Sequence, residues 1–146
     1  MTFIAITAYF QGVFGSRVTT EVIMTTPDMV TRWQAAWESL DPARIEAIYA
    51  SGAIHMSSVV AERMKCSDGT LRGRAEIRAY AEASTARLKS FKADILSVIA
   101  DAKDGTGRAS VEYWRILDGD EKRRARVVEI LEWENDRVTA CRVFHF

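Results

Sequence analysis

Residues 126–134 read Arg-Val-Val-Glu-Ile-Leu-Glu-Trp-Glu, and the alternation along this stretch predicts a β-strand. One face of that strand presents Val127, Glu129, Leu131 and Trp133, so Glu129 is the only charge on an otherwise apolar face. A buried carboxylate is costly unless it is paired, hydrogen-bonded or protonated. The stretch therefore predicts a sheet that covers a core and a candidate reaction site within it.

Four strands in series end the chain, with turn residues between them. We expect these strands at residues 91–102, 108–117, 122–134 and 137–146. Apolar residues at helical spacing, after a Thr26-Pro27-Asp28 start signal, predict helices further upstream. We expect the helices at about residues 27–40, 42–51 and 74–90, with one strand at 53–60 and a polar loop at 61–73. Helices followed by a meander predict an α+β domain over residues 26–146.

The charge balance of the chain argues against nucleic acid and membrane surfaces as partners. The 146 residues include 20 basic and 20 acidic side chains, and the basic cluster at 122–126 follows acidic residues in an expected hairpin. The two cysteines, Cys66 and Cys141, form no disulfide framework and favour a cytoplasmic location. No metal-ligand spacing, phosphate-binding loop or dinucleotide motif is present, so we expect no metal and no cofactor.

Residues 1–25 are interpreted as an extension before the domain. Their apolar stretch at 3–14 is too short to span a membrane, and no Lys or Arg precedes it as in a signal peptide. Four large apolar side chains of this extension need burial, most simply against a partner subunit: Phe3, Ile6, Phe10 and Phe14. The late strands are also apolar on both faces, which predicts a homodimer through the outer sheet face.

Four short motifs follow one another in the order and spacing typical of one superfamily. They are Trp33-x-x-Ala36-Trp37, Asp41 followed by Ile48-Tyr49-Ala50, Gly73-x-x-x-Ile77-x-x-Tyr80 and Arg137-Val138-x-x-x-Arg142-Val143-Phe144. Over residues 27–146 the chain resembles the nuclear transport factor 2-like superfamily, in its bacterial SnoaL-like and ketosteroid isomerase-like branch. The resemblance implies a cone-shaped fold, in which a curved, mostly antiparallel sheet wraps around three N-terminal helices and encloses one apolar pocket. Members range from isomerases, cyclases and dehydratases to non-catalytic binding modules, so the fold alone does not define the activity.

The resemblance extends to three positions of the isomerase site. Glu129 falls where the isomerase keeps a protonated acid that donates to a developing enolate oxygen. Trp33 stands in place of its oxyanion-hole tyrosine, and Ser57 stands in place of its general-base aspartate. One of the three residues is therefore matched in kind. The same alignment directs three residues of the last strand inward: Cys141, Val143 and His145.

The candidate catalytic residues are Glu129, His55 and His145. Histidine exchanges protons near neutral pH, although a lone histidine on a strand is more often structural. For Glu129, the alternative to catalysis is an ion pair with Arg115 or Arg142 on a neighbouring strand. The remaining candidates either line a substrate pocket or pack in the core: Trp33, Trp37, Tyr49, Ser57, Tyr80, Trp114, Cys141 and Val143.

Together these residues predict a cofactor-free enzyme that moves a proton on a small, largely apolar carbonyl or hydroxyl compound, as isomerases, cyclases and dehydratases do. The alternative is a non-catalytic module that binds a small molecule or forms a dimer. An unpaired Glu129, facing a cavity with a histidine within reach, favours the enzyme. An arginine salt bridge and a filled core favour the module.

Overall fold

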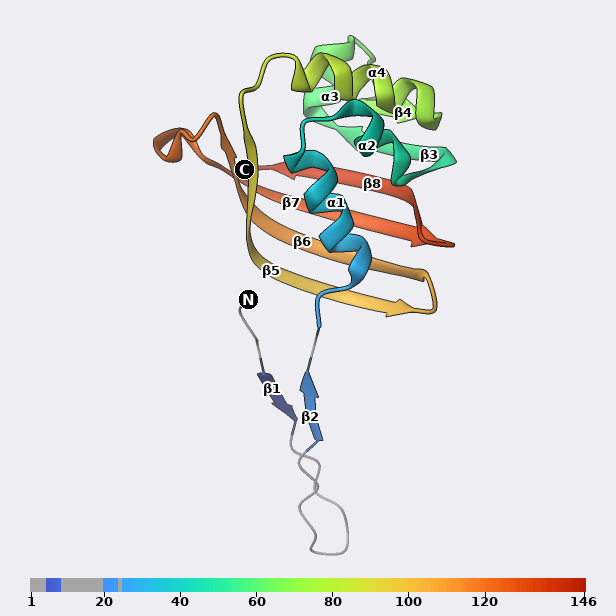
Figure 1. Cartoon of the computed structure of the whole chain (residues 1–146), viewed down its shortest axis with the longest axis vertical. Helices are drawn as coiled ribbons and strands as arrows, with labels where there is room; N and C mark the ends of the chain where they lie inside the picture. Colours follow the sequence, from blue (N-terminus) through green and yellow to red (C-terminus); the bar gives the residue numbers. More distant parts are fainter. Residues whose placement is uncertain (1–4, 9–19, 24) are drawn as a thin grey trace, which may run out of the picture.

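A curved six-stranded sheet forms the body of the molecule, in the strand order β4-β3-β8-β7-β6-β5 (Figure 1). The structure is a computed structural model that describes residues 5–8, 20–23 and 25–146. The strands of this sheet are β3 (Tyr49–Ser57), β4 (Thr70–Arg72), β5 (Phe91–Lys103), β6 (Thr106–Leu117), β7 (Ala125–Glu134) and β8 (Arg137–His145). Neighbouring strands are antiparallel except β3 and β8, which are parallel.

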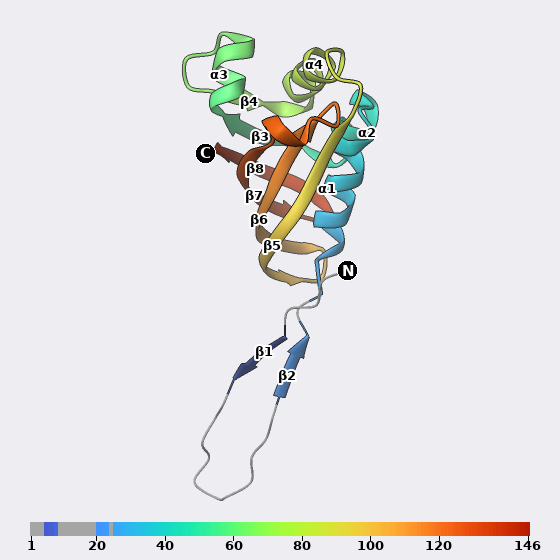
Figure 2. The same ribbon diagram turned by 90° about the vertical axis from the view of Figure 1, so that its left-hand side faces the viewer.

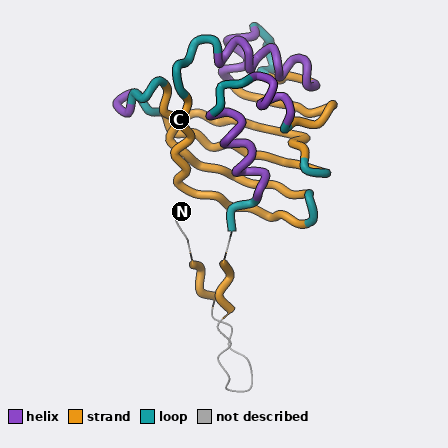
Figure 3. Tube along the Cα trace, in the orientation of Figure 1, coloured by secondary structure: helices purple, strands orange, loops and turns teal. Residues whose placement is uncertain are grey.

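Helices gather along one face and one end of the sheet (Figures 2 and 3). Those in the described residues are α1 (Asp28–Glu38), α2 (Pro42–Ala47), α3 (Ser58–Met64) and α4 (Gly73–Thr85). Helix α1 runs across the inner face of the sheet, while α2 and α4 pack together near β3. Among the residues described, no helix is both long enough and apolar enough to cross a membrane.

Two short strands near the N-terminus, β1 (Ala5–Ala8) and β2 (Thr20–Ile23), pair antiparallel in a separate two-stranded sheet. The expectation that the large apolar side chains of this extension are buried against a partner subunit falls on Phe3, Ile6, Phe10 and Phe14, whose side chains lie outside the described structure. All site residues described below belong to residues 25–146.

The core lies between α1 and the inner face of the sheet. Helical spacing puts Val30 and Trp33 on the buried side of α1. Alternation along β7 buries Val127, Leu131 and Trp133 beneath that helix. Burial of each such side chain contributes about 1.5–3 kcal/mol relative to exposure, so this contact stabilises the arrangement around the site.

The α+β class and the mostly antiparallel meander predicted from the sequence are confirmed. Strands β5, β6 and β8 lie within a few residues of the expected bounds. Strand β7 begins at Ala125 instead of residue 122, because Glu121–Arg123 forms a short 3-10 turn. The Asp120 carboxylate accepts the backbone N–H groups of Lys122 and Arg123, which holds this turn out of the sheet.

The chain on either side of β3 differs from the expectation. Helix α2 ends at Ala47, and Tyr49 begins β3 because it pairs with Val138 of β8. The strand ends at Ser57 and not at residue 60, since the Ser57 hydroxyl accepts the Val60 N–H over 3.1 Å and caps helix α3. The segment expected to be a polar loop therefore holds helix α3 and strand β4.

Two helix ends also differ from the prediction. Helix α1 has Pro27 at its N-cap position and no side-chain cap, so Thr26 does not cap it. Helix α4 ends at Thr85 instead of residue 90, and the N–H of Leu88 then closes a turn on the Thr85 carbonyl at 3.0 Å. This turn brings the chain from α4 back to the start of β5.

Candidate functional site

The register of the sheet aligns Glu129 with two other candidate residues. Glu129 of β7 lies opposite Val143 of β8 and Val111 of β6, and Val143 in turn lies opposite Ser57 of β3. Residues directly opposite one another in a sheet point to the same face. The row therefore places Ser57, Val143 and Glu129 together on the face that α1 covers.

Three neutral side chains donate hydrogen bonds to the Glu129 carboxylate. Trp33 Nε1 donates to Oε1 over 2.8 Å, the Cys141 thiol donates to Oε1 over 2.9 Å, and the Tyr113 hydroxyl donates to Oε2 over 3.0 Å. Tyr113 and Cys141 are the diagonal neighbours of Glu129 on β6 and β8. A carboxylate offers about four lone-pair sites, so the site that stays open belongs to Oε2.

Burial sets the protonation of Glu129. The side chain is 3% exposed, and burial raises its pKa from 4.5 to about 7, while the three donors oppose that rise. Within the part of the chain that the structure describes, no arginine forms a salt bridge with it. Arg142 pairs instead with Glu132. The alternative explanation of Glu129 as an ion-paired structural residue is therefore not supported.

His55 lies in a buried aromatic cluster. Its ring centroid is 5.5 Å from that of Tyr80 and 6.1 Å from that of Trp37, and the Tyr49 hydroxyl is 3.2 Å from its Nδ1. Burial lowers the pKa of His55 from 6.5 to about 4, so the ring is neutral at neutral pH. Burial also raises the pKa of Tyr49 well above its usual value, which keeps its hydroxyl proton available to Nδ1.

His145 is half-buried at the end of β8. Burial lowers its pKa, and the positive charge of Arg115 lowers it further. The Phe146 N–H donates to the Arg126 carbonyl over 3.1 Å, which fixes this end of the chain. Nδ1 of His145 is buried without a hydrogen-bond partner among the described residues, so this ring can bind a ligand.

In residues 25–146 and the two N-terminal strands, no three His, Cys, Asp or Glu side chains are grouped as metal ligands would be.

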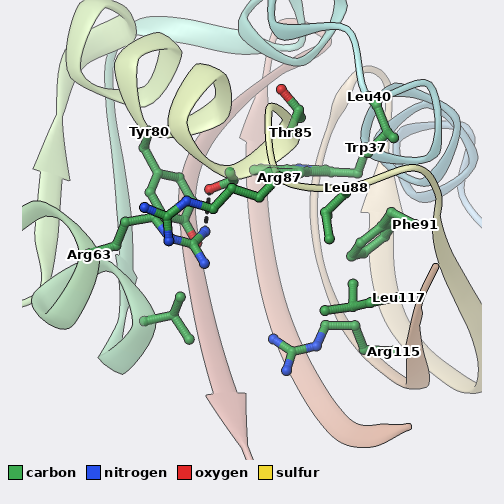
Figure 4. A pocket seen from close by; sticks show the side chains of 12 residues that line it. Trp37, Leu40, Arg63, Tyr80, Thr85, Arg87, Leu88, Phe91, Arg115 and Leu117 are labelled. Carbon is green, nitrogen blue, oxygen red and sulfur yellow. Dashed lines mark hydrogen bonds between the residues drawn. The ribbon is translucent and has the colours of Figure 1, made fainter. Parts of the chain in front are cut away.

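A cavity of about 60 Å³ lies against the Glu129 carboxylate. Besides Glu129, its walls are formed by Trp33, Trp37, His55, Ser57, Tyr80, Phe91, Tyr113, Arg115, Val143 and His145. A second hollow of about 110 Å³ adjoins this cavity and shares four of its wall residues (Figure 4). Both volumes are well below the roughly 300 Å³ at which ligand pockets usually begin. A third hollow, of about 410 Å³, shares Ser57, Val143 and His145 with the inner cavity, so Glu129 faces a small space that adjoins a larger one near the ends of β3 and β8.

Most of the candidate site residues predicted from the sequence form walls of the inner cavity. Three of them, Tyr49, Cys141 and Trp114, do not. Tyr49 and Cys141 lie behind the walls, each bonded to one wall residue. Trp114 lies on the outer face of β6, where the Arg124 guanidinium packs 4.3 Å from its ring centroid. The prediction that Trp114 lines the pocket is therefore wrong, because alternation turns its side chain away from the core.

Three wall residues were not predicted to line the pocket: Phe91, Tyr113 and Arg115, of which Arg115 was considered only as an ion-pair partner of Glu129. The prediction placed the pocket on the face of β6 that carries Trp114. The run Ala109, Val111, Tyr113 alternates on the opposite face and is the more uniformly buried of the two. That alternation was the signal that identifies Tyr113, and it extends to Arg115.

Comparison with known proteins gives one family and many structures of the same fold. A family model described as a SnoaL-like domain matches residues 30–141. A SnoaL-like protein of unknown function from Burkholderia thailandensis is 16% identical, with a TM-score of 0.65 over 80% of this chain and 89% of that one. A candidate polyketide cyclase from Sinorhizobium meliloti is 13% identical, with a TM-score of 0.63 over 82% of this chain and 95% of that one.

A third solved structure, a candidate dehydratase from the NTF2-like family of Streptomyces avermitilis, is 12% identical. Its TM-score is 0.63, over 81% of this chain and 91% of that one. No curated protein matches the chain in sequence. Identities this low establish a shared fold and do not establish a shared reaction.

Proposed function

The chain belongs to the SnoaL-like family of the nuclear transport factor 2-like superfamily, and we propose that it is a cofactor-free acid–base enzyme. Its substrate is a small, largely apolar carbonyl or hydroxyl compound. The observation that carries the proposal is Glu129, a buried carboxylate that neutral donors alone hold among the described residues and whose pKa is about 7. A group with a pKa near the working pH takes up and returns a proton most effectively.

The proton passes through Oε2 of Glu129. Oε1 already accepts two hydrogen bonds, whereas Oε2 accepts one, from Tyr113, within the part of the chain that the structure describes. In the ionised form, Oε2 removes a proton from the carbon next to a substrate carbonyl, and the C–H electron pair moves into an enolate. The protonated acid then returns that proton to carbon or oxygen. The donors to the carboxylate are already in place, so little reorganisation accompanies the charge change.

The histidines supply the second polar group. His55 is neutral at pH 7, and with Tyr49 donating to Nδ1 its ring proton lies on Nε2. A neutral N–H in a dry cavity stabilises a developing oxyanion by hydrogen bonding. His145 lines the same cavity with a free ring nitrogen. We assign His55 the role of oxyanion donor and His145 that of proton carrier towards the opening.

Deuterium exchange tests this proposal without knowledge of the natural substrate. A panel of small ketones is incubated with the protein in heavy water, and uptake of deuterium next to the carbonyl is followed by NMR. We expect the wild type to accelerate exchange for at least one ketone and Glu129→Gln to lose that acceleration. Glu134→Gln, an exposed position at the end of the same strand, is the matched control and keeps the wild-type rate.

A non-catalytic binding module is the second candidate, and the three hydrogen bonds that already hold the Glu129 carboxylate favour it, because a carboxylate held in this way can serve as a fixed polar group. In that case Glu129 is a polar anchor for a bound molecule. Ketones would then bind and shift the melting temperature, while exchange stays at the rate of solvent alone in both the wild type and Glu129→Gln. That pair of results would reject the enzyme and support the module.

We further propose a cytoplasmic location, on the chemistry of the thiols. Cys66 and Cys141 are both free, and the Cys141 thiol donates to the candidate catalytic carboxylate. Oxidation of Cys141 would remove this hydrogen bond. A reducing compartment keeps the thiol, and with it the site, intact.

A further inference from the structure

Three arginines converge on the outer hollow from separate elements (Figure 4). Arg63 comes from α3, Arg87 from the segment after α4, and Arg115 from β6. None of the three forms a salt bridge with any carboxylate of the described residues, although Glu62 lies near Arg63 and Arg87 at the surface. Because none of the three arginines is paired within the described residues, an anion placed between them would be attracted by each.

Local contacts hold the guanidinium group of Arg63 in place, and Arg115 has a buried donor that is not used among the described residues. Arg63 donates from Nη1 to the Ser84 hydroxyl over 2.6 Å, and its guanidinium carbon lies 5.8 Å from the centroid of the Tyr80 ring. Arg115 has a buried Nε that lacks any hydrogen-bond partner in the described part of the chain. A buried donor without a partner is costly, and a bound ligand would satisfy it. Arg63 is therefore positioned by its neighbours, and Arg115 offers a buried donor to a ligand.

The rest of the hollow is apolar. Trp37, Leu88, Phe91 and Leu117 form walls beside the arginines (Figure 4). Such walls suit a flat or aliphatic body, and the guanidinium groups suit its charged end, because they bind carboxylate and phosphate oxygens in pairs. The hollow is thus built for an amphipathic molecule and not for an inorganic ion alone.

The hollow and the Glu129 cavity share part of their walls. Trp37, Tyr80, Phe91 and Arg115 line both. A molecule whose charged end sits among the arginines therefore extends its other end towards Glu129. Arg63 and Arg87 line only the outer hollow, Glu129 lines only the inner cavity, and Arg115 lies in the wall that the two spaces share.

We propose that the substrate is a small organic anion, with an apolar body and a carboxylate or phosphate end that binds Arg63, Arg87 and Arg115. The proposal rests on the acid–base function, because the bound anion is a substrate only if the protein is an enzyme. It narrows the substrate class from any small apolar carbonyl compound to a keto or hydroxy compound that also carries an anionic group.

Calorimetric titration with three matched probes tests the inference: phenylacetate, its uncharged amide phenylacetamide, and phenyl phosphate. We expect the wild type to bind an anionic probe about tenfold or more tightly than the amide, as a hydrogen bond to a charged group provides. Tighter binding of phenylacetate identifies a carboxylate end, and tighter binding of phenyl phosphate identifies a phosphate end. Either result supports the proposal, whereas equal binding of all three probes overturns it.

Variants assign the effect to the arginines. Arg115→Gln and Arg63→Gln should each weaken the preference for the anion by about tenfold, which corresponds to the loss of one hydrogen bond to a charged group. Arg87 is exposed, so Arg87→Gln tests the same point with little risk to folding. The control is Arg108→Gln, which removes an exposed arginine of β6 outside the hollow and should leave the preference unchanged. A preference that survives all three hollow variants also overturns the proposal.

The anion preference and the acid–base function fail separately. Deuterium exchange on uncharged ketones reports on Glu129 and does not require the arginines. Exchange without an anion preference rejects only the substrate class. An anion preference without exchange on any ketone, charged or uncharged, rejects the enzyme and leaves an anion-binding module.

Discussion

The indole N–H of Trp33 donates to Oε1 of Glu129 over 2.8 Å, and both side chains are almost fully buried. This bond joins helix α1 to strand β7, two elements from opposite ends of the domain. It also lowers the pKa of Glu129, against the larger effect of burial. One contact therefore fixes the position of the carboxylate and adjusts its proton affinity.

Trp33→Phe removes this donor and keeps an aromatic side chain. We expect the pKa of Glu129 to rise above about 7 and the free energy of unfolding to fall by about 1–3 kcal/mol. The loss should be larger at pH 8 than at pH 5.5, because the ionised carboxylate depends more on the donor than the neutral acid does. Urea unfolding at the two pH values measures the loss, and infrared spectroscopy of the carboxyl group measures the pKa.

The matched control is Trp114→Phe on the outer face of the sheet. This substitution removes an indole of the same size without touching the Glu129 carboxylate. It should leave the pKa of Glu129 unchanged. If the two variants shift that pKa equally, the Trp33 bond does not control it.

Tyr113→Phe tests the oxygen that carries the proton. Within the described residues, the Tyr113 hydroxyl is the sole donor to Oε2, and phenylalanine preserves the ring. We expect the pKa of Glu129 to rise, and the midpoint of the pH profile for deuterium exchange to move upward by the same amount. Tyr80→Phe is the control, because Tyr80 lines the cavity without a hydrogen bond to Glu129. A shifted carboxyl pKa with an unmoved exchange profile would contradict the role of Oε2.

The inward position of Glu129 follows from the sequence, because a period of two assigns every residue of a strand to one face. The hydrogen-bond partners of Glu129 do not follow from this two-residue period. Tyr113 and Cys141 reach the carboxylate diagonally, and a diagonal depends on the register between strands. Between β7 and β8 that register is set by the two-residue turn at Asn135–Asp136, with φ values of 50° and 57°, and by an irregularity between Glu132 and Trp133 that shifts the pairing by one residue.

The segment around β3 is harder to predict, because local and long-range preferences disagree there. Tyr49 continues the helical spacing of Ile45, yet its backbone pairs with Val138 of β8. Ser57 continues the strand alternation, yet its hydroxyl begins a helix. A cap and a strand end share the same residue, so periodicity alone places the boundary several residues too late.

Apolar side chains on the outer face of the sheet lead us to predict self-association. Register places Ile99, Ile130, Val128 and Phe144 on this face, and Ile99 is 70% exposed. We expect a homodimer that buries more than about 1,200 Å² in total, as stable interfaces do. Light scattering at micromolar concentration measures its mass, and Phe144→Glu should shift the protein towards the monomer.

The control for the assembly prediction is Ala79→Glu, which adds the same charge on the exposed side of α4. That variant should keep the mass of the wild type. A wild-type mass equal to that of a single chain would contradict the dimer, and the apolar outer face would then need another explanation.

Glu129 and His55 should make opposite contributions to the pH dependence of stability. The pKa of Glu129 is raised from 4.5 to about 7, so between these values the folded state holds a proton that the unfolded state has lost. Stability due to Glu129 therefore falls as pH rises through this window, by about 1.4 kcal/mol per pH unit. The pKa of His55 is lowered from 6.5 to about 4, so the unfolded state holds the extra proton and stability rises with pH.

The two slopes cancel in the wild type where the windows overlap, from about pH 4.5 to pH 6.5. Glu129→Gln should expose the histidine slope, with stability that rises with pH, and it should be more stable than the wild type at pH 8. His55→Gln should expose the carboxylate slope, with stability that falls as pH rises. Urea unfolding at half-unit pH steps separates the two, and Glu134→Gln at the exposed end of β7 should follow the wild type. Parallel curves for Glu129→Gln and His55→Gln would show that the cavity does not shift these two groups in opposite directions, and the acid–base assignment would lose its physical basis.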